Sequence, residues 1–74
     1  MSKKYNIAIV GATGAVGETL ISILDQRSFP IENLYPLASK RSAGSKVSCQ
    51  GKSWTVEDLD TFDFSKVQIG IFSA

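Results

Sequence analysis

The sequence of 74 residues contains no histidine and a single cysteine, Cys49. Without histidine, the chain has no imidazole for zinc binding or for acid–base pairs. One thiol forms neither an internal disulfide nor a cysteine cluster that holds a metal. We therefore expect no metal site and no histidine-based acid–base pair in this chain.

Strong net charge and long apolar runs are also missing. Lysine and arginine total 8 against 7 acidic residues, so the net charge of +1 creates no field that attracts nucleic acid or an anionic membrane. The apolar stretches are a few residues long, whereas a membrane helix needs about 20. The polar residues 1–4 are not followed by a secretory apolar region. We expect a cytoplasmic protein without nucleic-acid or membrane partners.

The composition that remains is typical of a globular chain, because 43% of the residues are hydrophobic and 20% are charged. Autonomous domains most often have about 100 to 150 residues. Residues 1–74 therefore make up one small domain or part of a larger one.

The first part of the chain predicts a strand followed by a helix. Residues 5–10 are β-branched and nearly continuously apolar, which is typical of a strand buried on both faces of a parallel sheet. From about residue 15 to residue 27 the apolar residues recur at helical spacing, and Pro30 ends the helix. The stripe expected to pack on the sheet consists of Val16, Leu20, Ile23 and Leu24.

The middle of the chain predicts a second strand and a hairpin. Residues 34–38 form the strand, and Pro36 either keeps it short or lies where its nitrogen faces away from a partner. Residues 47–49 and 54–56 alternate in polarity around a four-residue connection that contains glycine, the pattern of a hairpin.

The last part of the chain predicts polar turns over residues 58–66 and a third buried strand over residues 67–72. A parallel strand at this place lacks a crossover helix to cover its face. We therefore expect the sequence to be the first portion of a longer domain.

The most specific pattern is the segment between the first strand and the helix. Gly11, Gly14 and Gly17 are spaced Gly-x-x-Gly-x-x-Gly there. Such a turn lets the backbone approach a pyrophosphate, because no Cβ stands in the way and the helix N-terminus presents free N–H groups. The residues expected at the phosphates are Gly11, Thr13, Gly14, Ala15 and Val16. A glycine-rich turn without a ligand is the alternative, but the order of strand, glycines and helix disfavours it.

This order predicts an α/β fold with a Rossmann-like parallel sheet and a small β-hairpin. Residues 1–74 are then the N-terminal portion of a dinucleotide-binding domain, without a catalytic or dimerisation domain.

The segment after the second predicted strand indicates which dinucleotide binds. An acidic residue there selects NAD through the ribose hydroxyl, whereas arginine accommodates the 2′-phosphate of NADP. No acid stands at this place, and Glu32 precedes the strand. Arg41 offers a charged fork to a phosphate, and Ser39 and Ser42 offer hydroxyl donors. We expect NADP as the cofactor, with a solvated basic loop as the alternative.

Other polar and aromatic residues receive a structural interpretation. Cys49 alternates with apolar residues and has no neighbour that would deprotonate it, so we expect a core residue and not a nucleophile. Trp54 is expected to pack in the hairpin. The acidic residues expected on a solvated surface are Glu57, Asp58, Asp60 and Asp63.

Four motifs in this order and spacing resemble the N-terminal region of the aspartate-semialdehyde dehydrogenase family. They are residues 9–17, Leu37-Ala38-Ser39 followed by Arg41-Ser42-Ala43-Gly44, Val56-Glu57-Asp58-Leu59, and Ile71-Phe72-Ser73-Ala74. The resemblance implies an oxidoreductase that uses NADPH to convert L-aspartyl-4-phosphate to L-aspartate-4-semialdehyde. This reaction leads to threonine, methionine, isoleucine and, through diaminopimelate, lysine.

The resemblance also implies roles for residues of this chain. The backbone of residues 13–16 would bind the cofactor phosphates, and Arg41 with Ser42 the 2′-phosphate. Ser73 and Ala74 match the start of the family's Ser-Ala-Gly-Gly cofactor loop. The full-length protein is expected to be a homodimer that binds NADP(H) and an acyl-phosphate or semialdehyde substrate.

The chain departs from the family pattern in the catalytic residues. The family's nucleophilic cysteine follows an asparagine, and it acts with a histidine and an arginine further along. Cys49 follows Ser48 and does not match. We therefore expect the 74-residue chain alone to be inactive. Alternatives are a segment of N-acetyl-γ-glutamyl-phosphate reductase, which shares the glycine turn, and a non-catalytic NADP-binding module.

Overall fold

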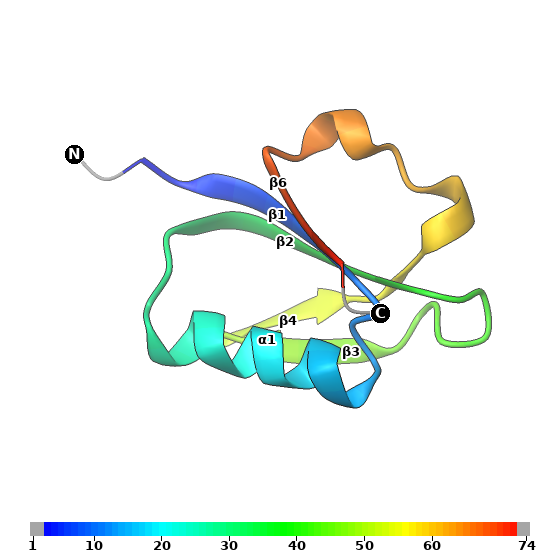
Figure 1. Cartoon of the computed structure of the whole chain (residues 1–74), viewed down its shortest axis with the longest axis horizontal. Helices are drawn as coiled ribbons and strands as arrows, with labels where there is room; N and C mark the ends of the chain where they lie inside the picture. The colour runs from blue at the N-terminus through cyan, green and yellow to red at the C-terminus, as the bar shows by residue number, and fades with distance from the viewer. Residues whose placement is uncertain (1–2, 73–74) are drawn as a thin grey trace.

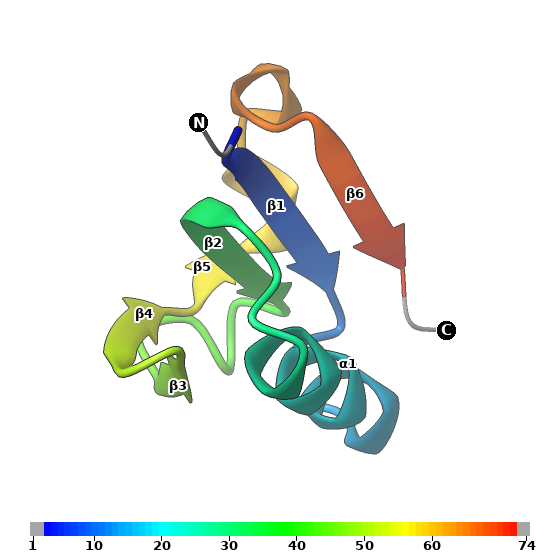
Figure 2. The same ribbon diagram turned by 90° about the vertical axis from the view of Figure 1, so that its left-hand side faces the viewer.

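A computed structural model describes residues 3–72, which form a four-stranded parallel sheet with a helix and a hairpin packed on one face (Figures 1 and 2). The sheet has the order β5-β2-β1-β6. Its strands are β1 (Tyr5–Val10), β2 (Ile31–Ala38), β5 (Glu57–Asp58) and β6 (Ile69–Phe72). Helix α1 (Ala15–Gln26) joins β1 to β2, and β3 (Lys46–Cys49) pairs with β4 (Lys52–Thr55) in the antiparallel hairpin. The predicted parallel sheet with a small hairpin is confirmed.

The core lies between the sheet and the layer formed by α1 and the hairpin. Ile7 and Ile9 of β1 have no exposed surface and point toward this layer. Ile21 and Leu24 of α1 meet them from the helix side, and Cys49 of β3 closes the same cluster. Burial of these apolar side chains holds α1 against the sheet and so places the start of the helix beside the end of β1.

The opposite face of the sheet carries a row of aromatic rings. The chain crosses this face between β5 and β6 through two short 3₁₀ turns, Leu59–Thr61 and Phe64–Lys66 (Figure 2). Ring centroids lie 5.1 Å apart for Tyr35 and Phe62 and 6.4 Å apart for Phe64 and Phe72. The predicted turns are confirmed, and the two-residue strand β5 beside them was not predicted.

Strand β2 is longer than predicted and contains Pro36 in its interior. The carbonyl of Leu37 accepts hydrogen bonds from the turn after β1. The backbone N–H and C=O groups of Leu37 therefore face β1. Neighbouring residues of a strand alternate in direction, and the nitrogen of Pro36 therefore faces the β5 side. The registered pairs between β2 and β5 begin only at Leu37. Pro36 thus removes no hydrogen bond between paired strands. This confirms the prediction that its nitrogen faces away from a partner strand.

The stripe of α1 that packs on the sheet agrees with the predicted one only at Leu24, which is buried. The other buried positions are Gly17 and Ile21, each one residue after a predicted position, whereas Val16 is 55% exposed and Ile23 is 41% exposed. Both stripes have helical spacing, so periodicity alone does not distinguish them. The close approach of Gly17 to the preceding turn selects the observed rotation of the helix.

The hairpin turn is tighter than predicted. β3 pairs with β4 through Cys49 and Lys52, which leaves Gln50 and Gly51 as a two-residue connection in place of the predicted four residues. Both residues have positive φ, 53° and 77°. A two-residue turn with this geometry matches the twist of the paired strands.

Strand β6 lies at the edge of the sheet, and its predicted burial is wrong. It starts at Ile69 and pairs only with β1. Ile69 and Ile71 are half-buried and Phe72 is 71% exposed, because no element within residues 3–72 covers the outer edge of β6. None of the helices in this part of the chain has the length and apolar character needed to cross a membrane.

Candidate dinucleotide-binding site

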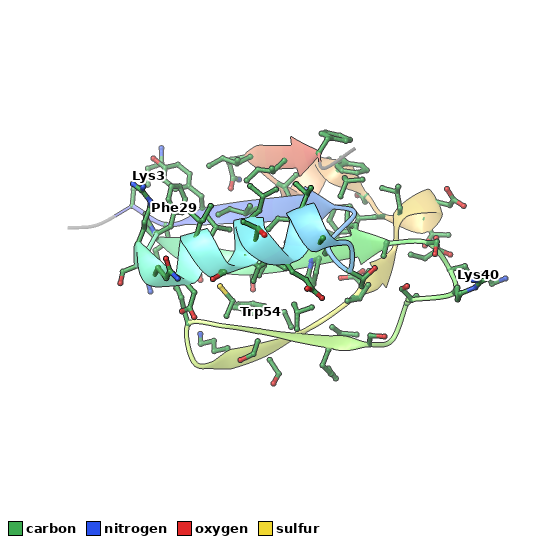
Figure 3. The ribbon with its side chains drawn as sticks, turned by 60° about the horizontal axis from the view of Figure 1, so that its bottom comes forward. Lys3, Phe29, Lys40 and Trp54 are labelled. Carbon is green, nitrogen blue, oxygen red and sulfur yellow. The ribbon has the colours of Figure 1, made fainter. Side chains whose placement is uncertain are left out.

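The two segments singled out in the sequence lie at one edge of the sheet. All four strands run parallel, so their carboxyl ends share an edge. The glycine turn follows β1, and the basic loop, residues 39–44, follows β2, its neighbour. Figure 3 shows Lys40 at the tip of the basic loop, at the end of the molecule opposite Lys3. In open α/β folds, ligands bind outside the carboxyl ends of the strands.

The glycine turn is tied directly to β2. The N–H groups of Gly11 and Ala12 both donate to the carbonyl of Leu37, at 2.9 and 3.0 Å. Gly11 has a φ of +82°, a conformation that favours glycine. The N–H of Gly14 then donates to the carbonyl of Gly11 at 3.1 Å. These bonds hold the turn next to the start of the basic loop.

Sequence reasoning missed the residues that anchor this turn. Ala12 and Leu37 have no exposed surface and hold the turn through backbone groups. The only sequence signal was the small size of Ala12, which directly follows Gly11.

The start of α1 presents backbone donors to solvent. Gly14 is the N-cap and provides no side-chain acceptor, and its carbonyl accepts the first helical bond, from Glu18. Within residues 3–72, no protein group accepts a hydrogen bond from the N–H of Ala15 or Val16. Thr13 and Gly14 are exposed, as are Ala15 and Val16. Free N–H groups and the positive end of the helix dipole suit a phosphate.

Gly17 allows the helix to start this close to the strand. A Cβ at this position would lie 2.2 Å from the carbonyl oxygen of Gly11 and 2.7 Å from the Cα of Ala12. Only glycine fits between the helix and the turn. Gly17 therefore serves the close packing of α1 on the turn.

The basic loop exposes the residues predicted to select the cofactor. Arg41 and Ser39 are exposed and Ser42 is half-buried. The Arg41 side chain makes no hydrogen bond or ion pair within the described part of the chain, so its guanidinium is available to an anion. Glu32 lies inside β2, not before it, but near the amino end, away from the loop.

Ser73 and Ala74, the third predicted part of the site, lie outside the described residues. The structure therefore brings together two of the three predicted parts. β6 places position 72 beside Val10, next to the glycine turn.

Residues set aside as non-catalytic have structural roles. Cys49 is 1% exposed, and burial, reinforced by the charge of Asp25, raises the pKa of its thiol. A thiol with a raised pKa is a poor nucleophile. Trp54 packs against the core and donates from Nε1 to the carbonyl of Cys49 at 3.2 Å (Figure 3). The predicted placement of Cys49 in the core and of Trp54 in the hairpin packing is confirmed.

Two of the acidic residues stabilise turns. Asp58 accepts a hydrogen bond from the N–H of Asp60 at 2.9 Å, and Asp63 accepts one from the N–H of Ser65 at 3.0 Å. The bonds from Ser65 lower the pKa of the Asp63 carboxyl. Across residues 3–72 no three acidic, cysteine or histidine side chains form a group that would hold a metal ion.

A glycine turn after the first parallel strand, free donors at the following helix and an exposed arginine after the second strand define a dinucleotide-binding α/β protein. Residues 6–74 match the family described as semialdehyde dehydrogenase, NAD binding domain. The chain belongs to this family.

The chain is also similar over its whole length to individual proteins. The chain is 57% identical over 74 residues to an aspartate-semialdehyde dehydrogenase of Legionella pneumophila, covering all of the chain and 21% of that protein. It is 49% identical over 74 residues to a Pseudomonas aeruginosa protein named USG-1 protein homolog, covering all of the chain and 22% of that protein. The chain thus spans about a fifth of the length of these relatives.

A solved structure of aspartate semialdehyde dehydrogenase II from Vibrio cholerae, complexed with ASA, superposes with a TM-score of 0.94 and 47% identity. The match covers 97% of this chain and 24% of that one. The family match and this structure favour the resemblance to aspartate-semialdehyde dehydrogenase over the alternative of N-acetyl-γ-glutamyl-phosphate reductase.

Proposed function

We propose that this chain is the cofactor-binding portion of an aspartate-semialdehyde dehydrogenase and that it binds NADP in preference to NAD. Two features carry the proposal: N–H groups at the start of α1 and the exposed Arg41 in the loop after the neighbouring strand, neither of which has a partner within residues 3–72. The N–H groups of Ala15 and Val16 would hold the pyrophosphate, and Arg41 with Ser39 and Ser42 would hold the 2′-phosphate.

The test of cofactor choice is titration of the chain with NADP and with NAD by calorimetry. Arg41→Ala should weaken NADP by roughly tenfold to a hundredfold, because a charge-assisted contact to phosphate contributes about 1.5 to 3 kcal/mol. NAD affinity should change little, since NAD lacks the 2′-phosphate.

Lys40→Ala is the matched control, because it removes an equal charge from the same exposed loop. It should weaken NADP less than Arg41→Ala, and salt should reduce its effect. Equal losses of NADP and NAD affinity in Arg41→Ala would refute the assignment of the loop.

We further propose that the full-length protein reduces L-aspartyl-4-phosphate to L-aspartate-4-semialdehyde, with NADPH supplying the hydride, in the synthesis of lysine, threonine, methionine and isoleucine. The family match and the relatives' names support this activity. We also propose that the full-length protein is a cytoplasmic homodimer, which fractionation and sedimentation of that protein would test.

The activity test uses aspartate semialdehyde, phosphate and NADP, with formation of NADPH followed by absorbance. The full-length protein should turn over. The 74-residue chain should not, because the only thiol is buried and there is no histidine. Because one relative has a name that states no enzymatic activity, failure of the full-length protein with retained NADP binding would favour the non-catalytic module.

A further inference from the structure

Backbone hydrogen bonds of the basic loop, and not any contact of the Arg41 side chain, set where the Cα of Arg41 lies. The N–H groups of Ser42 and Ala43 both donate to the carbonyl of Ser39, at 2.9 and 3.2 Å. The N–H of Ser45 donates to the carbonyl of Ser42 at 3.2 Å. Arg41 therefore lies inside a turn that is closed by hydrogen bonds of the loop itself.

The end of this turn is fastened to the protein interior at Gly44. Its N–H donates to the carbonyl of Val56 at 2.8 Å, and the N–H of Val56 donates to the carbonyl of Ser45 at 2.7 Å. Val56 is 1% exposed, so this anchor is part of the packed body. Gly44 has a φ of +96°, which side-chain-bearing residues rarely adopt.

We propose that Gly44 is a positioning residue for cofactor selectivity, because its left-handed backbone closes the Arg41 loop onto Val56 and holds the Cα of Arg41 where the guanidinium reaches the 2′-phosphate. The inference rests on the proposed NADP function of Arg41 and extends it to a residue that need not touch the cofactor. A residue with a side chain at position 44 is strained in this conformation. The loop then loses its hydrogen bonds to Val56 or shifts, and Arg41 moves with it.

Gly51 provides a matched control. It also has a positive φ, +77°, and it lies in the hairpin turn. No heavy atom lies within 4 Å of a Cβ built at either glycine, so alanine at each position introduces backbone strain without a clash. Gly44→Ala and Gly51→Ala therefore differ chiefly in whether the strain falls next to Arg41.

The experiment measures the dissociation constants of the chain for NADP and NAD by calorimetry. Gly44→Ala should weaken NADP about threefold to tenfold and change NAD less than about twofold, because strain of this kind is comparable to one weak contact. Gly51→Ala should leave the ratio of the two constants unchanged. Equal ratios in the two variants would overturn the inference.

A double-mutant cycle with Arg41→Ala separates this inference from the function on which it rests. In the Arg41→Ala background, Gly44→Ala should have no further effect on the NADP-to-NAD ratio. A ratio that responds to Arg41→Ala but not to Gly44→Ala refutes only the role of Gly44. A ratio that does not respond to Arg41→Ala refutes the proposed cofactor assignment itself.

A second substitution guards against a variant that fails to fold. Asparagine enters positive φ more readily than alanine, so Gly44→Asn should keep more of the NADP preference than Gly44→Ala. Loss of preference to the same extent in both, with the single tryptophan reporting a folded chain, would show that backbone conformation is not the cause.

Discussion

Replacing Gly17 by alanine (Gly17→Ala) tests how the helix is seated on the sheet. The added Cβ would lie 2.2 Å from the carbonyl oxygen of Gly11, 2.7 Å from the Cα of Ala12 and 2.9 Å from its carbonyl carbon. All three are backbone atoms, so no side-chain rotation relieves the contact. Normal contact distances require the start of α1 to move by roughly 1 Å.

The energetic consequence follows from two opposing terms. Forcing an extra carbon into a packed site costs about 1 to 3 kcal/mol. Alanine is the better helix former and offsets about 1 kcal/mol of this cost. Because the clash is with backbone atoms, we place the packing cost in the upper part of the range of about 1 to 3 kcal/mol. After the offset, we expect a net loss of about 1 to 2 kcal/mol in the free energy of unfolding.

The assay is urea unfolding followed by the fluorescence of Trp54, the only tryptophan. Gly14→Ala is the control, because its Cβ would lie 3.5 Å from the oxygen of Gly11, an ordinary contact, and Gly14 has extended backbone. It should change stability by less than about 0.5 kcal/mol. A Gly17→Ala variant as stable as the wild type would refute the argument that close approach fixes the helix.

Two further predictions concern the turn and the thiol. Gly14→Val should weaken NADP and NAD alike, by at least about tenfold in calorimetric titrations, because its side chain stands where the pyrophosphate binds whichever cofactor is used; loss of NADP alone would contradict this. Cys49 should react with iodoacetamide at least about ten times more slowly in the folded chain than in urea, because it is buried. Since the folded-state pKa lies above the ordinary value of 9.0, the contribution of this thiol to stability is present below pH 9.0 and lost as pH rises through the folded-state pKa. Urea unfolding across this range should show a loss in the wild type that Cys49→Ala lacks.

Much of the candidate site followed from local sequence. Gly11, Gly14 and Gly17 stand between an apolar run and an amphipathic segment, and the physical need for a close backbone turn gives that spacing one main interpretation. The predicted turn, helix start and exposed Arg41 all lie at one sheet edge, as parallel pairing requires.

The role of Gly44 was not evident from sequence. In the sequence Gly44 is one residue of a polar loop. Only the structure shows its positive φ and its backbone hydrogen bond to Val56, twelve positions away. A pairing across that distance depends on the hairpin that folds between the two residues, and local composition carries no signal of it.

The sequence by itself determined that an apolar strand, a glycine turn and an amphipathic helix follow one another, because these elements depend on neighbouring residues. Tertiary structure decided which side of the helix packs. Stripes one residue apart differ by about 100° around a helix and both are apolar here, and contact between Gly17 and the backbone of the turn selects one of them. Tertiary structure also decided that Pro36 fits inside β2 and that β6 is an edge strand. Both outcomes depend on which strands are the neighbours of β2 and β6 in the sheet.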